Sequence, residues 1–170
     1  MAIRINKQDK YFGLALYTYF KYNSNVQPSM LQPKDENSSC YEMLGATGDT
    51  FYLLIKFRST INQQAKDGSV TWALKLTEND KSQIEECASS GQKVFIIVVC
   101  CNHEIENANF LVLTYKEYLA IKEQTITTIK LIYSEKRFEN KLSIVKNRKV
   151  IFKVDRNRIE KNLLKIADAI

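Results

Sequence analysis

Hydrophobic residues near the start of the chain recur at the spacing of one helical face. In residues 10–22, Phe12, Leu16, Tyr19 and Phe20 fit that spacing, so the segment predicts a helix. A strand is the alternative, because Leu14 has the same parity as three of these residues. Residues 23–39 contain both prolines among many polar residues, and we predict a long surface loop there.

Alternating apolar positions after residue 50 predict two strands. A turn at residues 48–50 precedes the first strand, residues 51–59, and a polar loop separates it from the second, residues 70–76. One face of the first strand is apolar, and the other carries Tyr52, Leu54, Lys56 and Arg58. We predict that the two strands pair as a long antiparallel hairpin.

Two threonines mark the starts of helices. Thr77 and Thr114 are each followed three residues later by an acid, Asp80 and Glu117, which is the capping-box pattern. The first of these helices is expected to end at Gly91, which can adopt a left-handed conformation. Residues 94–101, between the two helices, are apolar on both faces and predict the central strand of a sheet, and residues 110–113 predict a short strand.

The last quarter of the chain predicts strands and a final helix. Residues 125–133, 141–145 and 149–154 have strand patterns, and Asn157 with Glu160 predicts the cap of a helix that continues to the C-terminus. The predicted fold class is therefore mixed α/β (α+β), a central mixed sheet with a long hairpin, flanking helices and C-terminal strands. We expect one domain over residues 1–170.

Composition excludes several classes of protein. With 45% hydrophobic residues, 5 Gly and 2 Pro, the chain is neither disordered nor fibrous. The longest apolar stretch, residues 94–101, is too short to cross a membrane, and the N-terminus lacks a signal-peptide core. We expect a cytoplasmic protein with no membrane partner. Its four cysteines are expected to be reduced thiols, mostly buried, that bind no metal.

Positive charge is concentrated at the C-terminal end. The net charge is +6, and residues 130–170, with 12 Lys+Arg against 5 Asp+Glu, contribute +7. A localised basic segment attracts polyanions, because each neutralised phosphate releases counterions. The alternative is a solvated lysine-rich surface with no ligand.

One triplet carries a resemblance to a known family. Leu54-Ile55-Lys56 lies in a strand that follows Asp49, and the order of elements over residues 10–124 resembles the core of the PD-(D/E)XK nuclease superfamily. The resemblance implies a restriction-endonuclease-like fold in which an acid-x-Lys triplet holds Mg²⁺. Leu54 stands where the acid is needed, so a central metal ligand is missing. Glu42 and Asp49 are the remaining candidate acids.

The chain therefore favours a binding module over an enzyme, with no cofactor unless an active nuclease uses Mg²⁺. We predict that it binds nucleic acid, DNA rather than RNA, as an accessory subunit of a DNA-processing or defence system. Two sets of residues are expected to contact phosphates. The predicted contacts are Lys56, Arg58 and Lys75 in the core, and Lys146, Arg148, Lys149, Lys153, Arg156 and Arg158 in the basic segment.

Two other functions stay open. A tyrosine-rich N-terminal third could form the surface of a protein-interaction module, such as an inhibitor, adaptor or assembly subunit that contacts a partner or a second copy of the chain. Its tyrosines are Tyr11, Tyr17, Tyr19, Tyr22, Tyr41 and Tyr52. The weaker alternative is an active Mg²⁺-dependent nuclease that uses Glu42 or Asp49. The lone histidine, His103, indicates a surface residue rather than a catalytic group.

Overall fold

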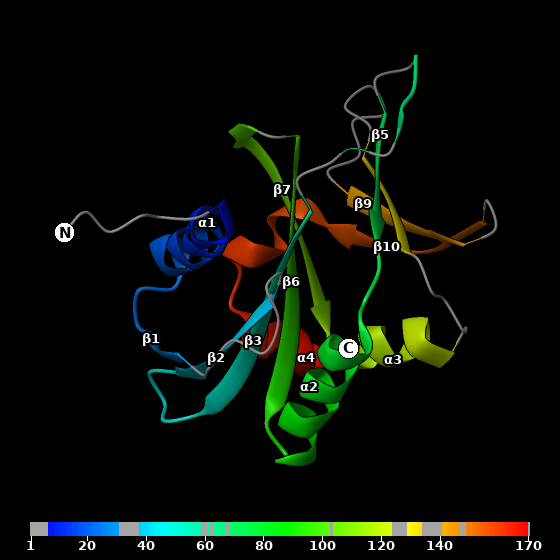
Figure 1. Ribbon diagram of the computed structural model, residues 1–170. Helices are drawn as coiled ribbons and strands as arrows, with labels where there is room; N and C mark the ends of the chain where they lie inside the picture. The colour runs from blue at the N-terminus through cyan, green and yellow to red at the C-terminus, as the bar shows by residue number, and fades with distance from the viewer. Residues whose placement is uncertain are drawn as a thin grey trace.

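The computed structural model describes residues 7–30, 38–58, 61, 63–66, 69–102, 104–123, 129–133, 141–146 and 149–169. These residues form two five-stranded sheets with flanking helices (Figure 1). The predicted fold class, a mixed α+β fold with a central mixed sheet, is confirmed. Arg148 and His103 lie outside the described residues.

The central sheet, which we call sheet A, has the strand order β1-β2-β3-β6-β7. β3 and β6 are parallel, and every other neighbouring pair is antiparallel. The predicted central strand is confirmed, because β6 lies between β3 and β7. The bounds are β1 (Gln27–Met30), β2 (Ser38–Leu44), β3 (Thr50–Arg58), β6 (Lys93–Asn102) and β7 (Glu104–Thr114).

One face of sheet A is covered by α1 (Lys7–Tyr22), the 3-10 helix η2 (Arg156–Glu160) and α4 (Leu163–Ala169). The predicted first helix is therefore confirmed. Its buried residues Tyr11, Ala15 and Tyr19 meet the odd-numbered residues of β3, such as Phe51 and Leu53. We call this layer the α1-side core.

The other face is covered by α2 (Glu78–Ser89), α3 (Tyr115–Glu123) and the second sheet. Both helices begin with the predicted capping boxes, and Gly91 has the expected positive φ of 77°. Ile84 of α2, Tyr118 of α3 and Trp72 of the second sheet are buried against even-numbered residues of sheet A, such as Leu54. We call this layer the α2-side core.

The second sheet, sheet B, has the order β10-β9-β8-β5-β4 and is antiparallel throughout. The predicted pairing of the strands at residues 51–59 and 70–76 is wrong, because β3 pairs with β2 and β6 while β5 pairs with β4 and β8. Strands lie in all three predicted C-terminal segments, and β8, β9 and β10 pair in chain order as a meander. The bounds are β4 (Gln63–Gln64), β5 (Val70–Leu74), β8 (Ile129–Tyr133), β9 (Lys141–Lys146) and β10 (Lys149–Asp155).

Two other segments differ from the prediction. The expected loop at residues 23–39 contains β1, whose Pro28 is tolerated because β1 is the edge strand of sheet A. The expected final helix is divided into η2 and α4, with Lys161 extended between them. Asn162 rather than Asn157 caps α4, because its Oδ1 accepts from the backbone N–H of Leu164 at 3.1 Å.

The helices of the described residues are short. α1 has 16 residues and carries Lys10 and Lys21 among its apolar positions, whereas a membrane crossing needs about 20 mainly apolar residues. None of the described helices meets that requirement of length and apolar character.

Candidate nucleic-acid interface

Lys56 is buried rather than exposed to a ligand. It lies near the C-terminal end of β3 on the α2-side face, with an exposed fraction of 3%. Its Nζ lies 2.5 Å from Oδ2 of Asp80 in the first turn of α2. Lys56 is therefore enclosed and engaged by Asp80, an arrangement that does not favour the predicted contact with a phosphate. The alternation of β3 placed Lys56 on the correct face but did not show which element covers that face.

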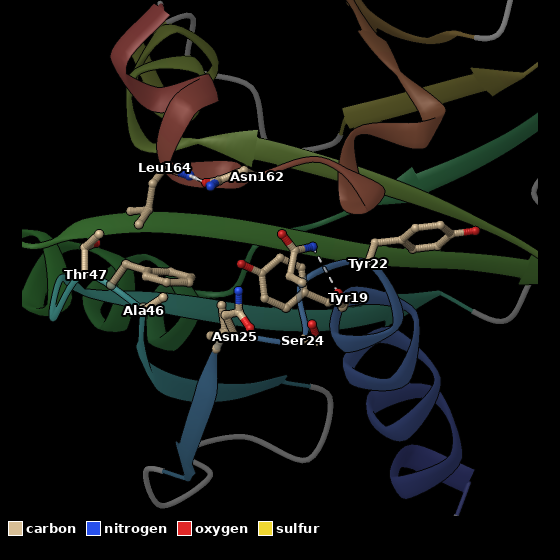
Figure 2. A pocket seen from close by; sticks show the side chains of 12 residues that line it. Tyr19, Tyr22, Ser24, Asn25, Ala46, Thr47, Asn162 and Leu164 are labelled. Atoms are coloured by element: carbon tan, nitrogen blue, oxygen red, sulfur yellow. Dashed lines mark hydrogen bonds between the residues drawn. The ribbon is translucent and has the colours of Figure 1, made fainter.

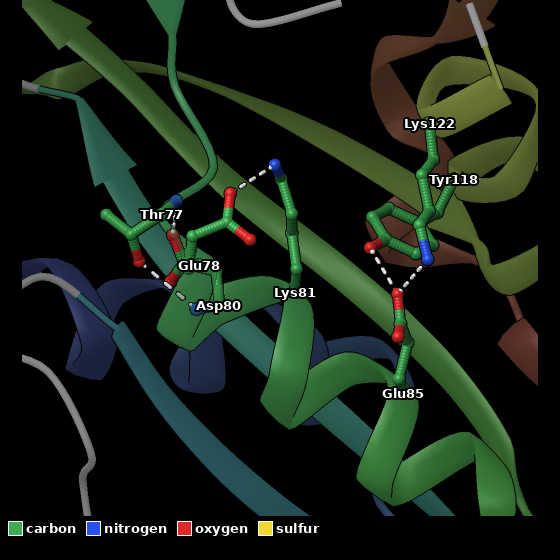
Figure 3. A network of polar contacts seen from close by, with 7 residues as sticks. All are labelled: Thr77, Glu78, Asp80, Lys81, Glu85, Tyr118 and Lys122. Carbon is green, nitrogen blue, oxygen red and sulfur yellow. Dashed lines mark hydrogen bonds and ion pairs between the residues drawn. The ribbon is translucent and has the colours of Figure 1, made fainter. Parts of the chain in front are cut away.

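Asp80 holds three groups together at the start of α2. Its Oδ2 accepts from Lys56. Figure 3 shows the capping contacts, in which Oδ2 also accepts from the Thr77 backbone N–H at 2.6 Å and the Asp80 backbone N–H donates to Thr77 Oγ1 at 3.1 Å. Its Oδ1 is buried and has no hydrogen-bond partner among the described residues. The capping acid was visible in the sequence, but its second role as the counter-ion of Lys56 was not.

The triplet that resembles the nuclease motif does not fit a Mg²⁺ site. Leu54 is fully buried in the α2-side core and has no oxygen to offer a hard cation. Glu42 is opposite Tyr52, four residues before Lys56 on β3, which separates the two positions by roughly 13 Å along the strand. Asp49 is exposed in the β2–β3 turn. Within the described ranges, no three His, Cys, Asp or Glu side chains gather as a metal site would require.

Arg158 also has a structural partner. Its guanidinium lies 2.7 Å from Oε2 of Glu117 and donates to the Val112 carbonyl of β7 at 3.2 Å. The side chains of Arg158 and Glu117 are 12% and 14% exposed. Glu117 caps α3 at the same time, so this ion pair fastens η2 to β7 and α3. The predicted phosphate contact by Arg158 conflicts with this arrangement.

Arg58 and Arg156 are half-buried and lie apart from the exposed lysines of sheet B. Arg58 ends β3 in sheet A, and its Nε is buried without a hydrogen-bond partner among the described residues. Arg156 begins η2 and lines a hollow of about 380 Å³ together with Asn109, Asn157 and Glu160. Those of the predicted contact residues that the structure describes therefore do not form one surface.

Sheet B carries the exposed part of the predicted set. Lys75 directly follows β5, and Lys149 and Lys153 lie on β10; all three side chains are exposed. Lys141 at the start of β9 is exposed too, although the sequence prediction omitted it. We call Lys75, Lys141, Lys149 and Lys153 the lysine set. Lys146 lies on β9, and its side chain is outside the described part of the structure.

The pairing of β9 with β10 places two of these lysines side by side. Lys153 is opposite Ser143 and Asp155 is opposite Lys141, so Lys141 and Lys153 are diagonal neighbours with Cα atoms about 7–8 Å apart. Asp155 is the acid on this part of the sheet, and it already pairs with Lys161 at 3.3 Å. Alternation at residues 141, 143 and 145 could have identified Lys141 from the sequence.

A β-bulge changes the predicted alternation of β10. Strict alternation along the strand would place Lys149, Ile151 and Lys153 on one face. The register shifts between Val150 and Phe152, and Ile151 packs against the α2-side core. Lys149 is opposite Lys146, whereas Lys153 is opposite Ser143, so the two lysines face positions of opposite parity on β9. Lys149 therefore lies at the end of the β9–β10 hairpin and does not share a face of the sheet with Lys153.

Two lysines of α2 and α3 contact acids, whereas Lys10, Lys21 and Lys165 on the other helices form no ion pair with a described residue. Figure 3 shows Lys81 with Glu78 on α2, and Lys122 of α3 with Glu85 of α2, which also accepts from the Tyr118 hydroxyl. The hydrogen bond from Lys122 lowers the pKa of the Glu85 carboxyl and raises that of Lys122. Lys75, Lys141 and Lys149 form no ion pair with any residue that the structure describes.

The N-terminal tyrosines are mostly internal. Tyr11, Tyr19 and Tyr41 are buried, whereas Tyr17 and Tyr22 are 66% and 49% exposed. Because these two are five residues apart on α1, they lie about 140° from each other around the helix axis. The tyrosines therefore do not form the continuous surface that the protein-interaction alternative expected.

A cavity of about 320 Å³ lies between the end of α1, the β2–β3 turn and the start of α4 (Figure 2). Its lining includes Tyr19, Asn23, Asn25 and Asn162, and none of its lining residues is charged. Asn23 Nδ2 donates to the Tyr19 carbonyl at 3.0 Å, and Asn162 caps α4, so part of the polar lining serves the fold itself. Nothing in this cavity indicates an anionic ligand.

Comparison of the chain with protein-family models, with curated proteins and with solved structures found no match. The resemblance to the nuclease superfamily thus gains no support from known relatives, and the charges and contacts described above are the basis for a functional proposal.

Proposed function

We propose that this protein is a nucleic-acid-binding accessory module that contacts the phosphate backbone through the lysine set of sheet B. The observation that carries the proposal is that exposed lysines without an acidic partner among the described residues lie on or beside sheet B, in the part of the fold where positive charge is concentrated. Lys81, Lys93 and Lys122 each contact an acid, whereas Lys75, Lys141 and Lys149 have no such partner.

The distribution of charge supports the same surface. Residues 130–170 carry a net charge of +7, and the first 129 residues carry −1. The strands β8, β9 and β10 belong to this basic segment and make up most of sheet B. Exposed cations attract phosphates at long range, and binding gains further from the release of counterions on contact.

The chemistry of lysine defines what kind of binding is expected. An ammonium group is a point charge with rotatable donors and does not read base edges in the bidentate manner of arginine. The arginines of the predicted set that the structure describes are half-buried, and Arg158 is held by Glu117. We therefore expect backbone contact without strong sequence preference, as in an accessory subunit that holds a nucleic acid for another protein.

A salt titration tests the proposal. Binding of a fluorescent duplex and of a single strand would be measured by anisotropy over a series of salt concentrations. For the duplex, each phosphate neutralised contributes about −0.9 to the slope of log K against log salt, so four contacts give a slope of roughly −3 to −4. No binding to either probe at low salt, or affinity that does not fall with salt, would contradict the proposal.

Two variants with the same change in net charge test whether binding depends on the lysine set itself or only on the total charge of the protein. The first variant replaces the lysine set with glutamine at positions 75, 141, 149 and 153. The second replaces the exposed residues Lys10, Lys21, Lys116 and Lys165, which lie outside sheet B, and so removes the same charge. The first variant should lose most of the affinity and most of the salt slope, while the second should keep them. Equal losses in the two variants would mean that sheet B is not the interface.

A further inference from the structure

Two cysteines from different elements lie in contact inside the α2-side core. Cys40 of β2 and Cys87 in the last turn of α2 have their Sγ atoms 3.6 Å apart, although the residues are separated by 47 positions in the sequence. Cys40 is fully buried and Cys87 is 9% exposed. Neither residue forms a disulfide in this structure.

We propose that Cys40 and Cys87 are a redox site that forms a reversible disulfide when the protein meets a peroxide. One thiolate attacks a peroxide oxygen, the O–O bond breaks, and the departing oxygen leaves as water, which produces a sulfenic acid. The second thiolate then attacks that sulfur, the S–O bond breaks and a second water leaves. In sum, two thiols lose two electrons and two protons, and one hydrogen peroxide is reduced to two waters.

The geometry requires only a small movement. A disulfide brings the sulfurs to about 2 Å, so the present separation of 3.6 Å must shorten by roughly 1.6 Å. Cys87 is next to the C-terminal end of α2, where Ser89, Ser90 and Gly91 are exposed. This end of the helix is less enclosed than the strand that carries Cys40, and Cys87 is the thiol closer to solvent. We therefore assign Cys87 as the residue that meets the oxidant and Cys40 as the residue that resolves the sulfenic acid.

The other two cysteines provide an internal comparison. Cys100 and Cys101 are neighbours on β6, but Cys100 packs in the α2-side core and Cys101 in the α1-side core. Strand geometry therefore holds their side chains on opposite faces of sheet A. Both are fully buried, and burial raises the pKa of the Cys100 thiol far above its usual value, which disfavours the reactive thiolate. Proximity of sulfurs thus distinguishes the pair of Cys40 and Cys87 from the remaining thiols.

The test uses the full wild-type chain in its folded state. The protein would be treated with hydrogen peroxide, its remaining thiols blocked with iodoacetamide, and its peptides mapped by mass spectrometry without reduction. We expect one intramolecular disulfide between the peptides that contain Cys40 and Cys87, the loss of two hydrogens from the intact mass, and full reversal by dithiothreitol. The unfolding temperature should rise by several degrees on oxidation, because the cross-link restricts the unfolded chain.

Two variants make the assignment specific. Cys87→Ser should form no intramolecular disulfide under the same treatment, whereas Cys100→Ala should form it as the wild type does. The wild-type peptide map does not depend on whether either variant folds. Oxidised protein in which Cys40 and Cys87 both remain alkylatable, or are linked only between molecules or to Cys100 or Cys101, would overturn the proposal.

Discussion

Lys56 of β3 and Asp80 of α2 form an ion pair inside the protein, with Nζ 2.5 Å from Oδ2 and with side chains only 4% and 0% exposed. Sheet A and the start of α2 are thereby joined by a contact between residues 24 positions apart. The pair lies next to the position where the nuclease resemblance placed a metal site. Its observable role in this structure is to position α2.

Removing one partner of this pair should be strongly destabilising. Asp80→Asn leaves the Lys56 ammonium buried without its counter-charge, and we expect the free energy of unfolding to fall by about 3–5 kcal/mol. Urea denaturation followed by circular dichroism measures the change. The double variant Lys56→Met with Asp80→Asn should be more stable than the sum of the two single effects predicts, because the uncompensated charge is then absent.

An exposed ion pair on the same helix is the control for this prediction. Lys81 and Glu78 are 33% and 89% exposed, and Lys81→Ala should cost less than about 1 kcal/mol. If Asp80→Asn were no more costly than Lys81→Ala, the Lys56–Asp80 contact would have no special role in stability.

Substitution of Glu117 should also lower the stability of the fold substantially. Its carboxylate accepts from the Thr114 backbone N–H at 2.9 Å and from Arg158 at 2.7 Å, so Glu117→Gln removes the charge from two contacts at once. We expect a loss of about 1.5–3 kcal/mol in a guanidinium unfolding experiment. Glu160→Gln on the exposed side of η2 is the control and should change stability very little. Equal effects of the two substitutions would contradict the role of Glu117.

Two glycines should respond to alanine in opposite directions. Gly48 in the β2–β3 turn has φ of 85°, a conformation that costs a residue with a Cβ about 1–2 kcal/mol, so Gly48→Ala should lower the unfolding temperature. Gly13 lies within α1, and an added Cβ would meet nothing within 4 Å. Gly13→Ala should therefore stabilise the protein by up to about 1 kcal/mol. A thermal melt of the two variants checks both signs, and a stabilising Gly48→Ala would contradict the first.

Tyr19 predicts a loss of stability at high pH. Burial raises its pKa from 10.0 to about 12, so the folded protein keeps the phenol protonated where the unfolded chain would ionise it. The stability that depends on a protonated Tyr19 side chain is fully present below pH 10 and is lost as the pH rises through about 12. Unfolding free energies measured across this window should fall less steeply for Tyr19→Phe than for the wild type. The same pH slope in both proteins would exclude Tyr19 as the cause.

Two single substitutions on sheet B should change the affinity for a duplex in opposite directions. Lys141→Gln should weaken duplex binding and reduce the salt slope by about 1. Asp155→Asn should do the reverse and strengthen binding, because it removes the acid opposite Lys141 and releases Lys161 from its ion pair. Anisotropy titrations at one fixed salt concentration measure both. If Asp155→Asn weakened binding, the electrostatic explanation would fail.

Local features of this fold were predictable because their causes are local. The capping boxes at Thr77 and Thr114 and the turn at Gly91 depend on residues within one or two helical turns. The strand β6 was identifiable because both of its faces are apolar. The partners of the strands were not predictable from the sequence. The pairing of β3 with β6 rather than with β5 depends on contacts between segments that are distant in the sequence.

The candidate site shows the same division between local and distant causes. Lys56 and Arg158 were recognised as basic residues, but their counter-ions Asp80 and Glu117 lie 24 and 41 positions away in the sequence. Each acid had already been assigned a local role as a helix cap, which concealed its second one. The displaced face of Lys149 follows from a bulge that depends on the partner strand.

The strand β6 contributes alternate side chains to both hydrophobic layers, with Phe95 and Ile97 in the α1-side core and Ile96 and Val98 in the α2-side core. If either the α1-side core or the α2-side core unfolded, one face of β6 would be exposed to solvent while its other face still packed in the remaining core. Thermal denaturation of the two layers should therefore be a single concerted event, and the amide hydrogens of β6 should be among the last to exchange with solvent.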